Sequence, residues 1–119
     1  MEVQLLEQFR DLKIDKDKLT QLLPLELKEI TLNKPIEICS KHIILLLENF
    51  EKGNMSKHML LDWVNTVWFS GLFEYCNENC DSIASVMNEL EEIDEEGKEL
   101  TNEKIKKYIH ALKKNIEIS

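Results

Sequence analysis

Cysteine and histidine side chains occur twice in the sequence at spacings that place both on one face of a helix. Cys39 precedes His42 by three residues, and Cys76 precedes Cys80 by four. Such a set could hold zinc through three thiolates and one imidazole. Neither pair has the C-x₂-C spacing of a zinc knuckle, however, and free cysteines are among the residues most often buried in cores. We therefore expect packing cysteines, with no metal and no cofactor bound.

A second metal-ligand pattern occupies residues 92–103. Gly97 stands sixth and Glu103 twelfth in this stretch, as in the calcium loop of an EF-hand. The first ligand position holds Glu92, which is one methylene longer than the usual Asp, and the eighth holds Glu99 where an apolar residue is usual. The stretch therefore favours an acidic connection between two helices over a calcium site.

The sequence contains no combination of residues that predicts an active site. Its histidines, His42, His58 and His110, are scattered along the chain. It has no Gly-rich phosphate loop and no H-E-x-x-H or G-x-S-x-G motif. We expect a protein that works by binding and is not an enzyme.

The distribution of charge indicates what kind of partner such a protein binds. The formal net charge is −8, which disfavours a nucleic-acid ligand because phosphates require cations. Residues 74–103 hold eleven acidic residues and one base, Lys98, so most of the negative field originates there. A field of this sign steers a basic partner.

Large aromatic residues accompany the acidic stretch. Trp63 falls on an apolar stripe and is assigned to the core, whereas Trp68, Phe69 and Phe73 either fill the core or anchor an interface. Combining exposed aromatics with the acids gives the predicted partner-binding residues: Trp68, Phe73, Glu74, Tyr75, Glu78, Asp81, Glu91, Glu92, Asp94, Glu95, Glu96 and Glu99.

Hydrophobic periodicity predicts an all-α fold, a compact bundle of five to six helices in a single domain over residues 1–119. The stretch 25–32 is ambiguous between a short helix and an irregular segment. Asn33 and Pro35 are typical of a helix start, and Pro24 of a helix end. The predicted helices cover residues 2–12, a short stretch before Pro24, 35–52, 57–75, 82–93 and 102–114.

The expected location is the cytoplasm, with the thiols reduced. The longest stretch without a charge, residues 63–73, is far shorter than the roughly 20 residues of a membrane span. The N-terminus has no basic start and no apolar signal core. We expect a monomer that binds neither membrane nor nucleic acid.

Residues 57–114 resemble the C-terminal half of small helical bacterial immunity proteins, including those of contact-dependent growth inhibition systems and of the tRNase colicins. The resemblance lies in the Trp-bearing residues 60–63 (LLDW), the polar break after them, residues 86–93 (VMNELEEI), Gly97 and a short basic closing helix. It implies a cytoplasmic immunity protein that neutralises a toxin, an RNase or DNase domain, by stoichiometric occlusion of its basic active site.

Two other functions agree with the same residues. An acidic protein can mimic nucleic acid and inhibit a phage or host nuclease, as anti-restriction and anti-CRISPR proteins do. A small calcium- or metal-binding regulatory module is the alternative from a different class.

Overall fold

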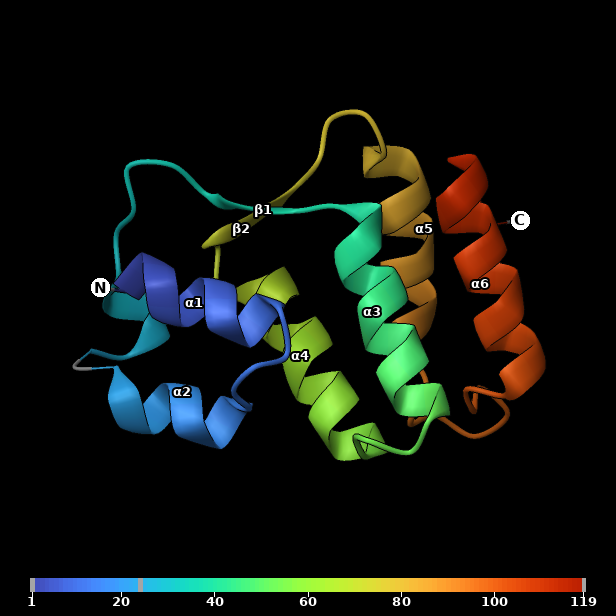
Figure 1. Cartoon of the computed structure of the whole chain (residues 1–119), viewed down its shortest axis with the longest axis horizontal. Helices are drawn as coiled ribbons and strands as arrows, with labels where there is room; N and C mark the ends of the chain where they lie inside the picture. Colours follow the sequence, from blue (N-terminus) through green and yellow to red (C-terminus); the bar gives the residue numbers. More distant parts are fainter. Residues whose placement is uncertain (1, 24, 119) are drawn as a thin grey trace.

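The computed structural model describes residues 2–23 and 25–118, so the predicted helix end at Pro24 lies outside the described residues. The described chain forms six α-helices, one 3₁₀ turn and two short strands (Figure 1). In chain order the elements are α1 (Glu2–Arg10), α2 (Lys16–Leu22), η1 (Leu27–Glu29), β1 (Ile36–Ile38), α3 (Ser40–Glu51), α4 (Lys57–Phe69), β2 (Phe73–Tyr75), α5 (Cys80–Leu90) and α6 (Asn102–Lys114). The protein is therefore mostly helical with six helices, as predicted, and the small two-stranded sheet corrects the prediction of an all-α fold.

The two strands form a parallel sheet in which Ile36, Glu37 and Ile38 are opposite Phe73, Glu74 and Tyr75, respectively. In β1 the two isoleucines are buried and Glu37 between them is exposed, which is the alternation of a half-buried strand. The helix predicted from residue 35 therefore begins only at Ser40, and Asn33 and Pro35 do not start it.

The helix predicted over residues 57–75 is also too long. It ends at Phe69, because Gly71 adopts a left-handed backbone conformation (φ +74°) that a helix cannot continue through. The Ser70 hydroxyl accepts a hydrogen bond from the Leu72 N–H (3.3 Å) in this turn. The chain then enters β2, which pairs with β1.

Three helices start with a capping hydrogen bond to a side-chain oxygen. Asp15, Ser56 and Thr101 each accept a bond from a backbone N–H in the first turn of α2, α4 and α6, at distances of 2.8, 3.1 and 3.2 Å. Helix α3 starts differently, because the Cys39 N–H donates to Nδ1 of His42 (2.8 Å).

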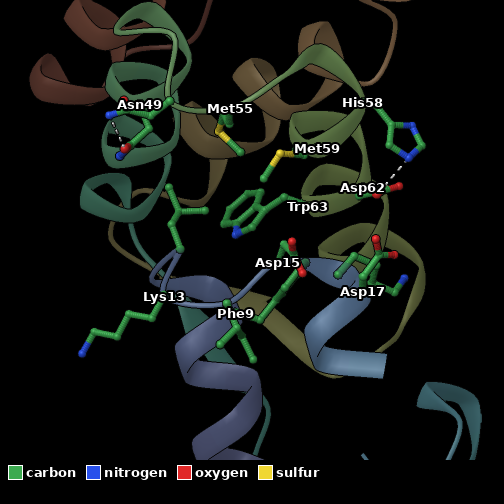
Figure 2. Close-up of a pocket in the computed structure, with 14 residues that line it drawn as sticks. Phe9, Lys13, Asp15, Asp17, Asn49, Met55, His58, Met59, Asp62 and Trp63 are labelled. Atoms are coloured by element: carbon green, nitrogen blue, oxygen red, sulfur yellow. Dashed lines mark hydrogen bonds and ion pairs between the residues drawn. The ribbon is translucent and has the colours of Figure 1, made fainter. Parts of the chain in front are cut away.

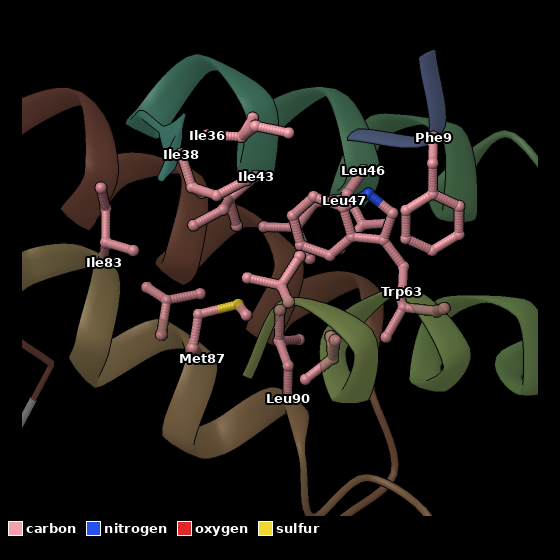
Figure 3. Close-up of a cluster of buried hydrophobic side chains, with 14 of the residues drawn as sticks. Phe9, Ile36, Ile38, Ile43, Leu46, Leu47, Trp63, Ile83, Met87 and Leu90 are labelled. Carbon is pink, nitrogen blue, oxygen red and sulfur yellow. The ribbon is translucent and has the colours of Figure 1, made fainter. Parts of the chain in front are cut away.

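The core lies where α3, α4 and α5 meet under β1 (Figure 3). Trp63 of α4 is 1% exposed and lies beside Phe9 and the buried leucines of α3. The buried residues Ile83, Met87 and Leu90 extend the same cluster along α5.

None of the helices in the described ranges is long and apolar enough to cross a membrane.

The elements are arranged in two regions (Figure 1). Helices α1 and α2 pack together at one end, and α2 also contacts α4. Helix α6 covers α3 and α5 at the other end. The connection between α5 and α6 therefore lies far along the molecule from α2.

Candidate partner-binding surface

Cys39 and Cys76 form a disulfide, so the expectation of three reduced thiols is wrong for this pair. Both residues directly follow the paired strands, and the Cys76 N–H donates to the Ile38 carbonyl (2.8 Å), which brings their side chains together. The sequence predicted Cys39 inside a helix over residues 35–52, and the structure corrects this because Cys39 precedes α3. It is half-buried at the N-cap of α3. Cys80 is free and exposed.

The four residues weighed above as a zinc set do not converge on one point. The one group of three or more metal-ligating side chains among the described residues consists of Glu37, Cys39 and Cys76, with atoms within 4.8 Å of one another. Its two sulfurs are bonded to each other, so they do not offer thiolates. His42 is not in this group, because its Nδ1 accepts from the Cys39 backbone.

His42 is the most strongly perturbed histidine described. It is 6% exposed, and burial lowers its pKa to about 4, with a further contribution from the positive charge of Arg10. Its Nε2 lies 3.7 Å from the Asp11 carboxylate, which opposes this lowering. The imidazole is therefore neutral near pH 7 and serves α3 as a hydrogen-bond acceptor.

Eleven of the twelve predicted binding residues fall into two groups at opposite ends of α5, and Trp68 of α4 belongs to neither. Phe73, Glu74, Tyr75, Glu78 and Asp81 lie on β2 and around the start of α5. The second group follows the end of α5 and consists of Glu91, Glu92, Asp94, Glu95, Glu96 and Glu99. Helix α5 has 11 residues, which separates the groups by about 16 Å along its axis.

The first group lies beside positive charge. The Asn115 side chain donates to the Glu78 carbonyl (2.9 Å), which places the end of α6 against the segment before α5. Lys113 and Lys114 lie in this last turn of α6. The segment that carries Glu78 therefore lies beside the lysine-bearing end of α6.

The second group forms the strongest concentration of negative charge, and we call residues 91–99 the acidic loop. It holds six carboxylates and one lysine. Lys98 pairs with Glu92 (3.3 Å), whereas Asp94, Glu95, Glu96 and Glu99 are exposed. The backbone of the loop is ordered by hydrogen bonds from the N–H groups of Glu95 and Lys98 to carbonyls three residues earlier, and Ile93 is buried beneath it.

Tyr75 is electrostatically linked to the second group. It is half-buried, and burial together with the negative charge of Glu91 raises its pKa to about 12. The phenol is a hydrogen-bond donor at neutral pH, as a phenol with the usual pKa would also be. Phe73 is also half-buried, so neither residue is a freely exposed anchor.

Trp68 lies apart from the acidic loop. Its ring is 41% exposed and meets the ring of Phe69 edge to face, with centroids 6.4 Å apart. Phe69 is 73% exposed and lines a hollow with Leu27 and Lys28 of η1, on the α2 side of the molecule. The sequence prediction omitted Phe69 from the site. Phe69 follows Asp62 by seven residues and Asn65 by four, and this helical spacing indicates that Phe69 lies on the polar face of α4.

The geometry of the acidic loop differs from a calcium site. Gly97 has φ +80°, as its position in the turn requires, but Glu92 at the first ligand position is paired with Lys98. Lys104 also enters the region, where its ammonium donates to the Glu99 carbonyl (3.1 Å). The expectation that calcium does not bind remains a prediction.

Comparison of the chain with protein-family models, with curated proteins and with solved structures finds no match.

Proposed function

We propose that this protein is a stoichiometric inhibitor that binds a basic protein partner through the acidic loop, and that the partner is the nuclease domain of a toxin against which it confers immunity. The observation that carries the proposal is the loop itself, which exposes most of its six carboxylates and contains one lysine.

The physical argument concerns the partner's charge. A nuclease domain is basic where it grips phosphates, so a surface dense in carboxylates complements it. Exposed charges that attract over a Debye length, about 8 Å at physiological salt, raise the association rate. Occlusion of the active site then inhibits the nuclease without any chemistry by the inhibitor.

The architecture of the loop supports this role. Exposed Asp94, Glu95 and Glu96 are held over buried Ile93 by an ordered turn between two packed helices. Less chain entropy is lost on binding when charged groups are already held in place.

The test uses charge reversal with a matched control. One variant carries Glu95→Lys, Glu96→Lys and Glu99→Lys in the acidic loop. The control reverses three acids on the α1–η1 side, Glu7, Glu26 and Glu29, and so changes the net charge equally. The binding probe is the C-terminal domain of the protein encoded immediately upstream, measured by stopped-flow association, nuclease inhibition and growth rescue.

We expect the loop variant to associate at least tenfold more slowly at low salt and the control to associate at nearly the original rate. The difference should shrink as salt is raised. If the upstream domain is not neutralised by the unaltered protein, the proposed immunity function is wrong. If the control variant loses binding and the loop variant does not, the interface lies at the other end of the molecule.

A further inference from the structure

The seam between α2 and α4 contains a hollow of about 270 Å³ (Figure 2). One wall comes from the α1–α2 connection and the start of α2, and the other from the α3–α4 connection and α4. Its apolar lining includes Phe9, Met55, Met59 and Trp63 (Figure 2). Trp63 is 1% exposed and forms the base, whereas Met59 is 37% exposed at the mouth.

Three carboxylates lie on one side of this hollow. They belong to Asp15, Asp17 and Asp62 (Figure 2). Among the described residues, none of the three pairs with a lysine or arginine side chain. Asp62 lies 3.3 Å from Nε2 of His58, whose side chain is 85% exposed. The hollow therefore combines an apolar base with three carboxylates, of which Asp15 also caps α2.

The lysines that line the hollow do not neutralise it. Lys13 points away from the indole of Trp63 (Figure 2). The Lys16 ammonium donates to the Thr66 hydroxyl (3.0 Å), one turn along α4 from Asp62, and is not paired with any of the three aspartates. A cation entering the hollow would meet the carboxylates of Asp17 and Asp62, whereas Asp15 already caps α2.

The hollow continues along α4 as a groove. A second hollow shares Lys16 and Asp62 with the first and reaches Leu27, Thr66 and Phe69. Phe69 is the most exposed large hydrophobic residue described. We call the two hollows together the α2–α4 groove. An elongated groove with an acidic end and an apolar end fits a length of polypeptide better than a compact small molecule.

We infer that the α2–α4 groove binds a segment of a partner protein, in which an arginine or lysine enters the acidic hollow and an apolar side chain contacts Phe69. The long aliphatic stem of a basic residue packs on apolar surface while its head group stays near charge. Met55 and Met59 are flexible enough to adapt to that stem. Asp17 and Asp62 supply the acceptors for the cationic head group.

The groove also sets the spacing of the two contacts. Asp62 and Phe69 are seven residues apart on α4, about 10 Å along the helix axis. An extended chain covers this distance in about three residues. The partner segment should therefore carry its basic and apolar residues three positions apart when extended.

This inference is independent of the proposed function. The groove is built by α2, α4, η1 and the connections before α2 and α4, whereas the acidic loop joins α5 to α6. A peptide test needs no toxin, so it can succeed or fail separately from the immunity proposal.

The probe is an eight-residue peptide of glycine and serine in which an arginine and a leucine stand three positions apart. The protein carries Trp68→Phe, so that Trp63 at the base of the hollow is its remaining tryptophan. Trp63 fluorescence and backbone amide shifts follow the titration. We expect saturable binding below about 1 mM, and at least tenfold weaker binding when citrulline replaces the arginine.

Matched variants test the two ends of the groove. We expect Asp17→Asn with Asp62→Asn to weaken peptide binding at least tenfold, and Phe69→Ser to weaken it at least threefold. The control, Glu95→Gln with Glu96→Gln, removes the same number of charges from the acidic loop and should leave affinity unchanged. Equal weakening by the control, or no saturable signal at 5 mM peptide with every variant folded by circular dichroism, would overturn the inference.

Discussion

The acidic loop and the α2–α4 groove both present carboxylates without enough nearby cations, yet they differ in what lies beneath the charge. The loop holds six carboxylates in nine residues and rests on one buried side chain, Ile93. The groove holds three aspartates above an apolar base that includes Trp63. Charge in the loop therefore acts mainly at long range, and charge in the groove acts together with apolar contact.

This difference separates two steps of binding. Exposed charges change how fast a partner arrives, and their effect falls with salt. Apolar contacts with charged groups held against them change how long the partner stays. If both surfaces bind the same partner, reversing the loop charges should slow association of that partner. A substitution that places a larger side chain in the groove should speed its dissociation.

The largest effect should come from removing the base of the groove. Trp63→Ala deletes a side chain that is 1% exposed, together with the hydrogen bond from its Nε1 to the Arg10 carbonyl (3.2 Å). We expect a loss of about 3–5 kcal/mol in the free energy of unfolding, measured by urea denaturation. Glu95→Ala in the acidic loop should change it by less than about 0.5 kcal/mol.

Similar losses from the two substitutions would show that Glu95 of the acidic loop contributes as much to the free energy of unfolding as Trp63 does. Trp63→Leu is the milder variant to use if Trp63→Ala does not fold.

The disulfide should have the next largest effect. It links residues 37 apart in sequence, and closing a loop of this length stabilises a folded chain by about 3–4 kcal/mol. Cys39→Ser with Cys76→Ser should lower the urea midpoint accordingly, in a Cys80→Ser background that prevents thiol exchange. Adding dithiothreitol to the protein that retains this disulfide should reproduce the loss, whereas dithiothreitol should not affect the doubly substituted protein. An unchanged midpoint would contradict the stabilising role.

The helical core was predictable because its signal is local. The apolar positions Ile43 and Leu46 of α3, and Trp63 and Val67 of α4, recur every three or four residues. The caps at Ser56 and Thr101 were predictable for the same reason, since each is decided within one turn.

The strands were missed because three residues are too few to establish an alternating pattern. Ile36 also continues the spacing of the α3 stripe, so β1 was assigned to the helix that follows it. The disulfide carries no local signal, since three cysteines allow three pairings and only the strand register brings Cys39 beside Cys76. The groove has no sequence signature because it arises where distant elements pack.

The pH dependence of stability should distinguish the α1–α3 contact from the acidic loop. The pKa of His42 is lowered to about 4 in the folded protein from 6.5, so the unfolded chain binds more protons between these values. Stability from this group is complete above pH 6.5 and falls as the pH is lowered toward 4. We expect a loss of about 2 kcal/mol between pH 7 and pH 5, measured by urea denaturation.

His42→Gln keeps an acceptor for the Cys39 N–H and should abolish most of this dependence. Glu95→Gln with Glu96→Gln should retain it. If the loop variant flattens the profile and His42→Gln does not, the titration has been assigned to the wrong region.

The smallest effect should be that of calcium on the acidic loop. Glu92 is paired with Lys98, and Lys104 donates to the Glu99 carbonyl, so binding calcium would require breaking these contacts. A site with a dissociation constant of 10⁻⁴ M would stabilise the protein by about 2.3 kcal/mol in 5 mM calcium, which raises the melting temperature by several degrees. We expect a shift of less than about 1 °C, equal to that in magnesium at the same ionic strength. A larger, calcium-specific shift that disappears in Glu103→Gln would show that the loop binds the ion and that its charge serves a metal site instead of a basic partner.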